Sequence, residues 1–250
     1  MIKRVIVFLY GVVCYVVFLG TFLYAIGFVV NLFVPRSIDA PASGSFPTNL
    51  LVDLGLLLLF AAQHSGMARP GFKHWLTRSV PEPAERSTYV LASSLALIVL
   101  FAFWQPLGGV IWSVEDRVAV AVLYGLGAFG WLLVLVATFL INHFDLFGLR
   151  QVWLYLLGKP YTPLAFRTPG PYRLVRHPLY VGWFFAFWAT PTMTVAHLLF
   201  AIATTGYILV AIQLEERDLV TFLGEDYRRY RERVPMLIPF TKRARRPAAQ

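Results

Sequence analysis

The sequence has little cysteine and little charge, and both shortages restrict what the protein can be. Its single cysteine, Cys14, leaves no disulfide framework and no cysteine-ligated metal site. Charged residues make up only 14% of the chain, whereas a soluble domain has about 25%. The motifs of P-loop enzymes, dinucleotide-binding folds, serine hydrolases and zinc proteases are absent from usable positions. Soluble nucleotide folds and the common hydrolytic mechanisms are therefore disfavoured.

Apolar residues are in excess: they make up 58% of the chain. Several apolar runs reach the length of about 20 residues that a membrane helix needs. They predict spans at 5–34, 49–66, 88–107 and 117–142, followed by a longer run over 180–214. Because Thr190-Pro191-Thr192 interrupts this last run, it predicts a helical hairpin with both ends on one side. We expect an all-α integral membrane protein with four spanning helices and a C-terminal hairpin, five or six membrane helices in total, and no Rossmann fold.

The positions of the 22 Lys and Arg residues predict the orientation. With the N-terminus in the cytoplasm and a hairpin at 180–214, all of them except Arg36 and Arg117 lie on the cytoplasmic side. This predicts a bacterial inner-membrane protein with both termini in the cytoplasm. The net charge of +9, which includes the basic tail at 242–246, then indicates contact with membrane lipids rather than nucleic acid binding.

Residues 168–183 combine polar groups with three prolines, which prevent one continuous helix up to Pro178. His177 enters the predicted hairpin and Glu215 leaves it, so antiparallel packing would bring them to the same membrane depth. A carboxylate at that depth requires a partner or a ligand. The pair is therefore a candidate functional site. The alternative is an ion pair that closes the base of the hairpin, drawn from Arg173, Arg176, Glu215 and Glu216.

Two further groups of polar residues lie on the predicted inner face. His64, at the inner end of the second span, is either a general base, for which a pKa near ~6.5 is suitable, or an interfacial residue bound to backbone. His143 and Asp145 form a weak metal pattern because no third ligand is in register. They fit better as an end-cap of the fourth span or as part of a cofactor wall, and we expect no metal site.

Several segments in order carry a family resemblance: Gly170-Pro-Tyr172, Arg176-His-Pro-Leu-Tyr180, Glu215-Glu216 and Gly224-Glu-Asp-Tyr227. Over about residues 142–240 they resemble the isoprenylcysteine carboxyl methyltransferase family. In the N-terminal half, Gln63-His-Ser-Gly-Met-Ala-Arg-Pro and Glu85-Arg-Ser-Thr-Tyr resemble the NnrU-like branch, and in it the bacterial methanethiol S-methyltransferases.

The resemblance implies S-adenosylmethionine as the cofactor, bound on the cytoplasmic side without a Rossmann fold. We expect N-terminal membrane helices at 1–141 and a methyltransferase region at 142–250. That region would hold a cofactor turn at 166–183, the hairpin at 180–214 and an amphipathic helix at 215–234. The residues that the resemblance places at the cofactor are Gln151, Phe166, Arg167, Tyr172, His177, Pro178 and Tyr180.

Glu215 falls where the prenylcysteine enzymes have an acceptor-site glutamate, but their arginine four residues earlier corresponds to Ala211. An acceptor without a carboxylate, such as a small thiol, fits that difference. The expected reaction is in-line methyl transfer to methanethiol, which forms dimethyl sulfide. The candidate catalytic residues are His64, Glu215 and Tyr180, with His64 and Glu215 also at the substrate. A lipid amine or prenylcysteine methyltransferase, or a non-catalytic NnrU-like protein, are the alternatives.

Overall fold

The computed structural model describes residues 1–41 and 43–241, so the basic tail at 242–246 lies outside the described residues. In this part of the chain five helices are long and apolar enough to cross a membrane. They are α1 (Ile2–Val30), α2 (Phe46–Met67), α4 (Glu85–Phe103), α5 (Arg117–Ile141) and α9 (Val195–Leu223). A 3₁₀ turn, η1 (Glu82–Ala84), leads directly into α4. The predicted all-α membrane architecture is confirmed.

Shorter elements connect these helices. Six are helical: α3 (Pro70–Leu76), α6 (His143–Leu146), α7 (Leu149–Leu156), η2 (Gly170–Arg173), α8 (Pro178–Trp188) and α10 (Glu225–Arg233). Two are short strands, β1 (Val110–Ser113) and β2 (Thr192–Thr194), which pair antiparallel. The described residues form no Rossmann fold, since these two strands are their only sheet.

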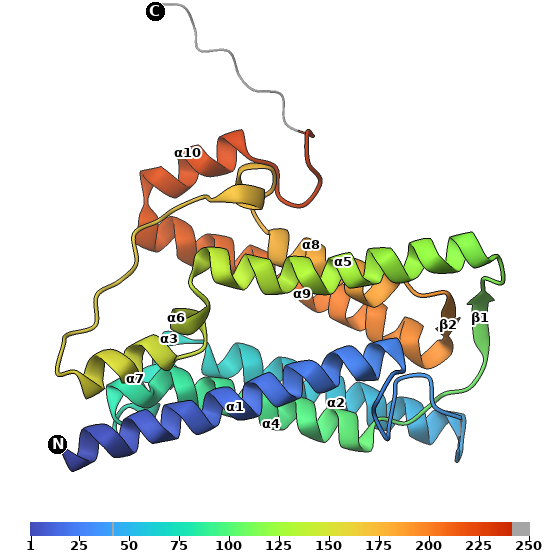
Figure 1. Cartoon of the computed structure of the whole chain (residues 1–250), viewed down its shortest axis with the longest axis horizontal. Helices are drawn as coiled ribbons and strands as arrows, with labels where there is room; N and C mark the ends of the chain where they lie inside the picture. Colours follow the sequence, from blue (N-terminus) through green and yellow to red (C-terminus); the bar gives the residue numbers. More distant parts are fainter. Residues whose placement is uncertain (42, 242–250) are drawn as a thin grey trace, which may run out of the picture.

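The helices form two layers (Figure 1). In one, α4 packs between α1 and α2; in the other, α5 packs along α8, and α9 contacts both α8 and α2. A buried aromatic cluster fills the space between the layers, with Phe28 at its centre and ring centroids 4.8 Å from Phe101 and 6.4 Å from Phe200. The N-terminus, α7 and α10 lie at one end of the molecule, and β1 and β2 lie at the other.

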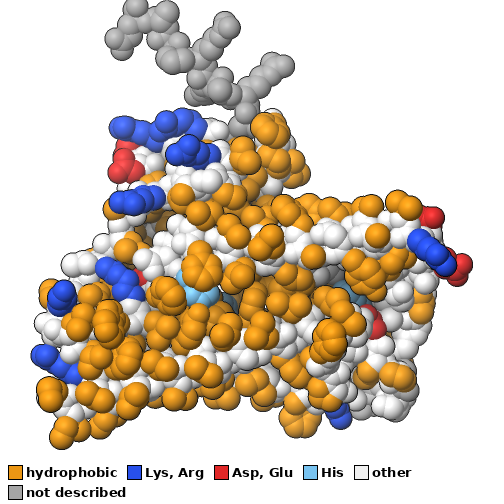
Figure 2. Space-filling model, in the orientation of Figure 1, with side chains coloured by type: hydrophobic (Ala, Val, Ile, Leu, Met, Phe, Trp, Pro, Cys, Tyr) orange, Lys and Arg blue, Asp and Glu red, His pale blue; other side chains and the backbone are white. Residues whose placement is uncertain are grey.

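Hydrophobic and basic side chains occupy different parts of the surface along the same direction. Figure 2 shows hydrophobic side chains over the flanks of the long helices, and Lys and Arg gathered over α10 and towards the N-terminus. Apolar flanks are suited to lipid, because about 30 Å of hydrocarbon has to be crossed. The distribution is that of an integral membrane protein with one basic end.

The hairpin is asymmetric. Its first helix, α8, has 11 residues and spans roughly 16 Å at 1.5 Å per residue, about half of a bilayer core. The chain then turns at Pro191, pairs β2 with β1, and continues in α9. That second helix extends past 214 to Leu223, and only Gly224, with φ +58°, separates it from α10.

At the end opposite to α10, a polar cluster connects the α1–α2 loop to the start of α9. Asp39 Oδ2 lies 3.2 Å from His197 Nδ1, and Asn31 Nδ2 donates to the same oxygen. Thr194 Oγ1 donates to Asp39 Oδ1, and His197 Nε2 faces the Phe187 carbonyl oxygen at 3.0 Å. Burial raises the pKa of Asp39, but the hydrogen bonds from His197 and Thr194 outweigh it, so the pKa lies below its ordinary value. The ionised Asp39 carboxylate therefore connects the α1–α2 loop to β2 and to the first turn of α9.

Asp39→Asn should therefore lower the thermal stability. A buried pair that loses one partner costs about 3–5 kcal/mol. Folding lowers the pKa of Asp39. The carboxylate therefore stabilises the protein at pH values above its pKa in the unfolded chain, and this stabilisation is lost as the pH falls through its pKa in the folded protein. The melting temperature in detergent should fall at pH 7, and the difference from wild type should shrink below about pH 4. Glu115→Gln, at an exposed residue of the same end, is the control; equal melting temperatures for the two variants would contradict the assignment.

Candidate functional site

The site is built on the turn that precedes α8. Pro169 leads into η2, and Gly170 adopts a positive φ of +51°, which a residue with a side chain would adopt only with strain. His177 is the N-cap residue of α8, and Pro178 occupies the first position of the helix, where its missing N–H costs nothing. The turn is fixed from outside as well, since the Arg176 and His177 amides donate to the carbonyls of Pro235 and Met236. The segment after α10 therefore holds the start of α8 in place.

Glu216 lies at the centre of this arrangement and is buried. Its Oε1 accepts hydrogen bonds from Arg176 Nε at 2.6 Å and faces His177 Nε2 at 3.0 Å. Its Oε2 lies 3.6 Å from Arg231 Nε on α10. Arg176 also donates to the backbone oxygens of Arg231 and Val234. One carboxylate thus connects α9, the turn before α8 and α10.

The neighbouring carboxylate, Glu215, has a different environment. Its side chain is 44% exposed, and its Oε2 accepts a hydrogen bond from the Tyr180 hydroxyl at 2.9 Å. The same oxygen lies 3.9 Å from His177 Nδ1. His177 is therefore flanked by two carboxylates, Glu216 at Nε2 and Glu215 at Nδ1. The structure brings together the two residues that the hairpin argument paired, and it also contains the ion pair that was the alternative.

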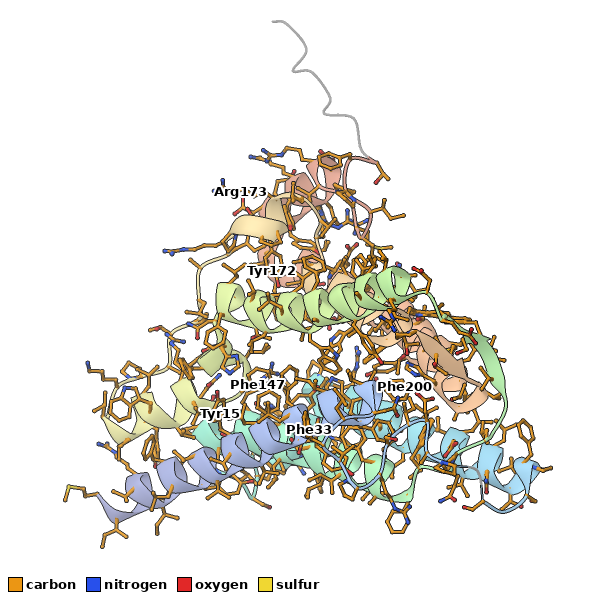
Figure 3. The ribbon with its side chains drawn as sticks, turned by 45° about the vertical axis from the view of Figure 1, so that its right-hand side comes forward. Tyr15, Phe33, Phe147, Tyr172, Arg173 and Phe200 are labelled. Carbon is orange, nitrogen blue, oxygen red and sulfur yellow. The ribbon has the colours of Figure 1, made fainter. Side chains whose placement is uncertain are left out.

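An aromatic group adjoins the two carboxylates. The Phe166 ring packs against Tyr230 with centroids 5.5 Å apart, and the Tyr230 hydroxyl donates to the Tyr172 carbonyl oxygen at 2.6 Å. Burial raises the pKa of Tyr172, and Glu215 raises it further. Burial also raises the pKa of Tyr230 to about 12, with Arg176 opposing and Glu216 adding to it. Both hydroxyls are protonated at neutral pH. In Figure 3 Tyr172 lies on the side of η2 towards α5, and Arg173 lies on its outer side.

His64 belongs to a second cluster, between α2, α4 and α9. Its Nδ1 lies 3.1 Å from Ser93 Oγ and its Nε2 lies 2.9 Å from the Tyr89 hydroxyl. Tyr207 on α9 approaches the His64 ring, with centroids 6.4 Å apart, and its hydroxyl lies 3.0 Å from Ser65 Oγ. Both His64 nitrogens therefore have a hydroxyl partner already. Tyr207 connects this cluster to the α9 face that carries Glu215.

His143 and Asp145 are used separately. The Tyr15 hydroxyl and Thr138 Oγ1 each lie 2.8 Å from a His143 ring nitrogen, Nε2 and Nδ1 respectively. Burial lowers the pKa of His143, which favours the neutral ring. Asp145 instead pairs with Arg150 at 2.8 Å. Within residues 1–41 and 43–241 no three metal-ligating side chains gather at one point.

Comparison with known proteins identifies the family. The model of the NnrU protein family matches residues 53–235, which is most of the chain and includes both clusters. The chain belongs to the NnrU family.

Named relatives cover almost the whole chain. A protein named methanethiol S-methyltransferase from Crocosphaera subtropica is 61% identical over 239 residues, which is 96% of this chain and 94% of that protein. One of the same name from Mycobacterium tuberculosis is 52% identical over 241 residues, covering 96% and 99%. Nurim from Bos taurus is 35% identical over 179 residues, covering 68% of each chain. No solved structure matches.

In this NnrU-family protein, contacts join part of the predicted site into two sets, and Glu215 of one set acts electrostatically on Tyr172 of the other. Phe166 and Tyr172 meet through Tyr230, and His177, Tyr180 and Glu215 meet directly. Pro178 is buried, and Arg167 is exposed. Gln151 lies on α7, where its Nε2 donates to the Asp145 carbonyl oxygen, and His64 instead contacts Ser93, Tyr89 and Tyr207. Which of these residues act in function stays a prediction.

Tyr207 is a residue that the sequence argument missed. It precedes Ala211 and Glu215 by four and eight positions in α9, so all three lie along one face of the helix. That spacing, together with the polar neighbours Thr204 and Thr205, was the available signal. In this NnrU-family protein the face leads from the His64 cluster to the carboxylates.

Proposed function

We propose that the protein is a membrane methyltransferase that transfers a methyl group from S-adenosylmethionine to methanethiol and forms dimethyl sulfide. The similarity to proteins named methanethiol S-methyltransferase, which extends over 96% of the chain, carries this proposal. The Tyr207–Ala211–Glu215 face of α9 supports it. Ala211 is four residues from each of Tyr207 and Glu215 and has a small side chain, and no arginine is present there to select an acceptor carboxylate.

The residues fit the proposed cofactor. The Gln151 Oε1 atom is buried without a hydrogen-bond partner, so it can accept from an amine or a hydroxyl group. The rings of Phe166 and Tyr172 can stack on a base or face a cation. Arg167 is exposed and can pair with a carboxylate. We propose that these four residues, with His177, Pro178 and Tyr180, hold the cofactor.

S-adenosylmethionine supplies a methyl carbon that is electrophilic because it is bonded to a sulfonium. The protein has to align a thiol with this carbon, exclude water and accept the thiol proton. Alignment alone can contribute about 7–11 kcal/mol to lowering the barrier. A free thiol is mostly protonated at neutral pH, so a nearby base increases the thiolate fraction. We propose that Glu215, oriented by the Tyr180 hydroxyl, takes this proton, and that His64 lines the acceptor side.

We also propose that the basic end of the molecule faces the cytoplasm of a bacterial inner membrane. All Lys and Arg residues except Arg36 and Arg117 then lie on that side, as the positive-inside rule requires. The carboxylate cluster at the α8–α9 base lies at the same end, where the partly exposed Glu215 would face the compartment that holds soluble cofactors.

A methyl-transfer assay tests the function. Protein purified into nanodiscs, given S-adenosylmethionine and methanethiol, should release dimethyl sulfide that gas chromatography detects. A panel with longer thiols, prenylcysteine and phosphatidylethanolamine identifies other acceptors. Product from only one of the last two would favour the lipid amine or prenylcysteine alternative. Absence of S-adenosylmethionine binding by calorimetry would favour a non-catalytic protein.

Ala211→Leu should lower kcat/KM for methanethiol by about 10–100-fold, because a larger side chain fills space beside Glu215 and overpacking costs about 1–3 kcal/mol. Binding of S-adenosylmethionine, measured by calorimetry, should change little. Val210→Leu is the matched control, since Val210 is 60% exposed on the apolar flank of the same helix. Unchanged kinetics in Ala211→Leu would place the acceptor elsewhere.

A further inference from the structure

Glu216 is not explained by the proposed reaction, although it has the most charged partners of any carboxylate in the described residues. It is buried, and it accepts from Arg176 Nε at 2.6 Å while Arg231 Nε lies at 3.6 Å. An arginine is always protonated, so Glu216 beside two of them is ionised. A carboxylate can only accept hydrogen bonds. His177 Nε2, which faces Glu216 Oε1 at 3.0 Å, must therefore carry a proton.

This assignment determines the other nitrogen. With the proton on Nε2, a neutral His177 has its lone pair on Nδ1. Nδ1 lies 3.9 Å from Glu215 Oε2, the oxygen that also accepts from the Tyr180 hydroxyl. One water or a small side-chain movement can bridge that distance, and catalytic hydrogen bonds are often long before the substrate binds. The basic nitrogen therefore faces the group proposed to receive the thiol proton.

The ring is also fixed in position. The His177 amide donates to the Met236 carbonyl oxygen, and the Arg176 amide donates to that of Pro235. Tyr180 packs against the imidazole with ring centroids 5.5 Å apart. A rigid backbone, a packed ring and an anchored Nε2–H leave one orientation for Nδ1. This is the arrangement by which a buried carboxylate sets the tautomer of a catalytic histidine.

We propose that Glu216 is a positioning residue that holds His177 as the final acceptor of the thiol proton. The proposal rests on the proposed function. The thiol S–H bond breaks, and its proton passes to Glu215 Oε2 and then to His177 Nδ1. The thiolate lone pair forms the new bond to the methyl carbon as the sulfonium C–S bond breaks and its electron pair stays on the departing sulfur. The resulting imidazolium lies between two carboxylates, and its proton returns to water through the exposed Glu215.

Five charged or titratable groups act on this proton. Two lie on α9, one on α8, one in the turn before it and one on α10: Glu215, Glu216, Tyr180, Arg176 and Arg231. Of these, the Glu216 carboxylate is the one in hydrogen-bond contact with the imidazole, and it stabilises the charged ring. Removing this carboxylate takes away the negative charge nearest to the ring, so the acid limb of the kcat/KM profile should move to lower pH.

The test compares Glu216→Gln with Glu225→Gln, an exposed glutamate on α10 whose partners are surface arginines. Carboxylates that orient a metal-ligating histidine contribute about 10–100-fold, and we expect kcat to fall by a similar factor in Glu216→Gln. KM for methanethiol and calorimetric binding of S-adenosylmethionine should stay within about threefold. Glu216→Asp should recover part of the loss. A loss of binding equal to the loss of kcat, with no displacement of the acid limb, would show a purely structural role and overturn the proposal.

A second measurement needs no activity, and its only variant serves to assign one signal. Nitrogen-15 NMR of histidine-labelled wild-type protein, with His177→Gln to assign the signal, should show His177 protonated at Nε2 and unprotonated at Nδ1 at neutral pH. An Nδ1–H tautomer, or a ring that stays doubly protonated over the whole range from pH 5 to pH 9, would overturn the proposal. If wild-type protein forms no dimethyl sulfide, the proposed function fails, while this spectrum still decides the tautomer.

Discussion

Replacing Glu215 by glutamine is expected to lower the rate of dimethyl sulfide formation by about 10²–10⁴-fold, which is the usual contribution of a positioned acid or base. The amide keeps the size of the side chain and can still accept from the Tyr180 hydroxyl, so the local packing should survive. It cannot take up the thiol proton, and it removes the negative charge beside His177 Nδ1. The loss should appear in kcat, because neither effect removes a contact with the proposed cofactor residues.

The measurement is initial-rate dimethyl sulfide release in nanodiscs, with S-adenosylmethionine affinity measured in parallel by calorimetry. Glu225→Gln again supplies the matched control, and Tyr180→Phe should give a smaller loss, since it removes only the hydrogen bond that orients Glu215. A Glu215→Gln protein with wild-type kcat would rule Glu215 out as the proton acceptor. His64 would then be the remaining predicted base, in spite of the hydroxyl partners on both of its nitrogens.

The membrane architecture could be predicted from the sequence because it depends on local properties. Long apolar runs define the spans, and Pro191 lies in the short break between the end of α8 at Trp188 and the start of β2, where the chain reverses. The end of α9 was harder to predict, because Glu215 and Glu216 suggest that an apolar helix has ended. The helix continues to Leu223 since Tyr180, Arg176 and His177 satisfy these carboxylates, and those partners come from other elements.

The adjacent glutamates show why the site was predictable only in outline. The sequence allowed either a functional His–Glu pair or an ion pair that closes the hairpin. The structure contains both, because successive residues on a helix point about 100° apart. Glu216 points to the buried arginine and Glu215 to the half-exposed side. Whether Glu215 or Glu216 forms the buried ion pair depends on α10 and on residues 235–236, which contact the turn before α8. These contacts join segments far apart in the chain, so no local sequence pattern predicts them.

Gly182→Val is expected to have the largest structural effect. Gly182 faces Gly130 where α8 crosses α5, and a Cβ atom on Gly182 would lie 2.8 Å from the Gly130 carbonyl oxygen and 2.9 Å from the Val134 backbone nitrogen. Backbone atoms cannot move aside as a flexible side chain can, so the two helices would have to separate. Small residues allow such close approach between membrane helices, and overpacking costs about 1–3 kcal/mol or more. We expect a protein that aggregates on size exclusion or melts far below wild type.

The matched control is Gly125→Val in α5, because a Cβ atom at Gly125 meets no other group within 4 Å. It should keep wild-type stability to within about 1 kcal/mol. Gly182 lies only five residues after His177, so separating α8 from α5 also displaces the turn that carries the proposed site. Gly182→Val should therefore lose S-adenosylmethionine binding together with its melting temperature, whereas Glu215→Gln should keep both and lose only turnover. If Gly182→Val melts and binds like Gly125→Val, α8 does not pack this closely on α5, and the rigid support inferred for His177 fails with it.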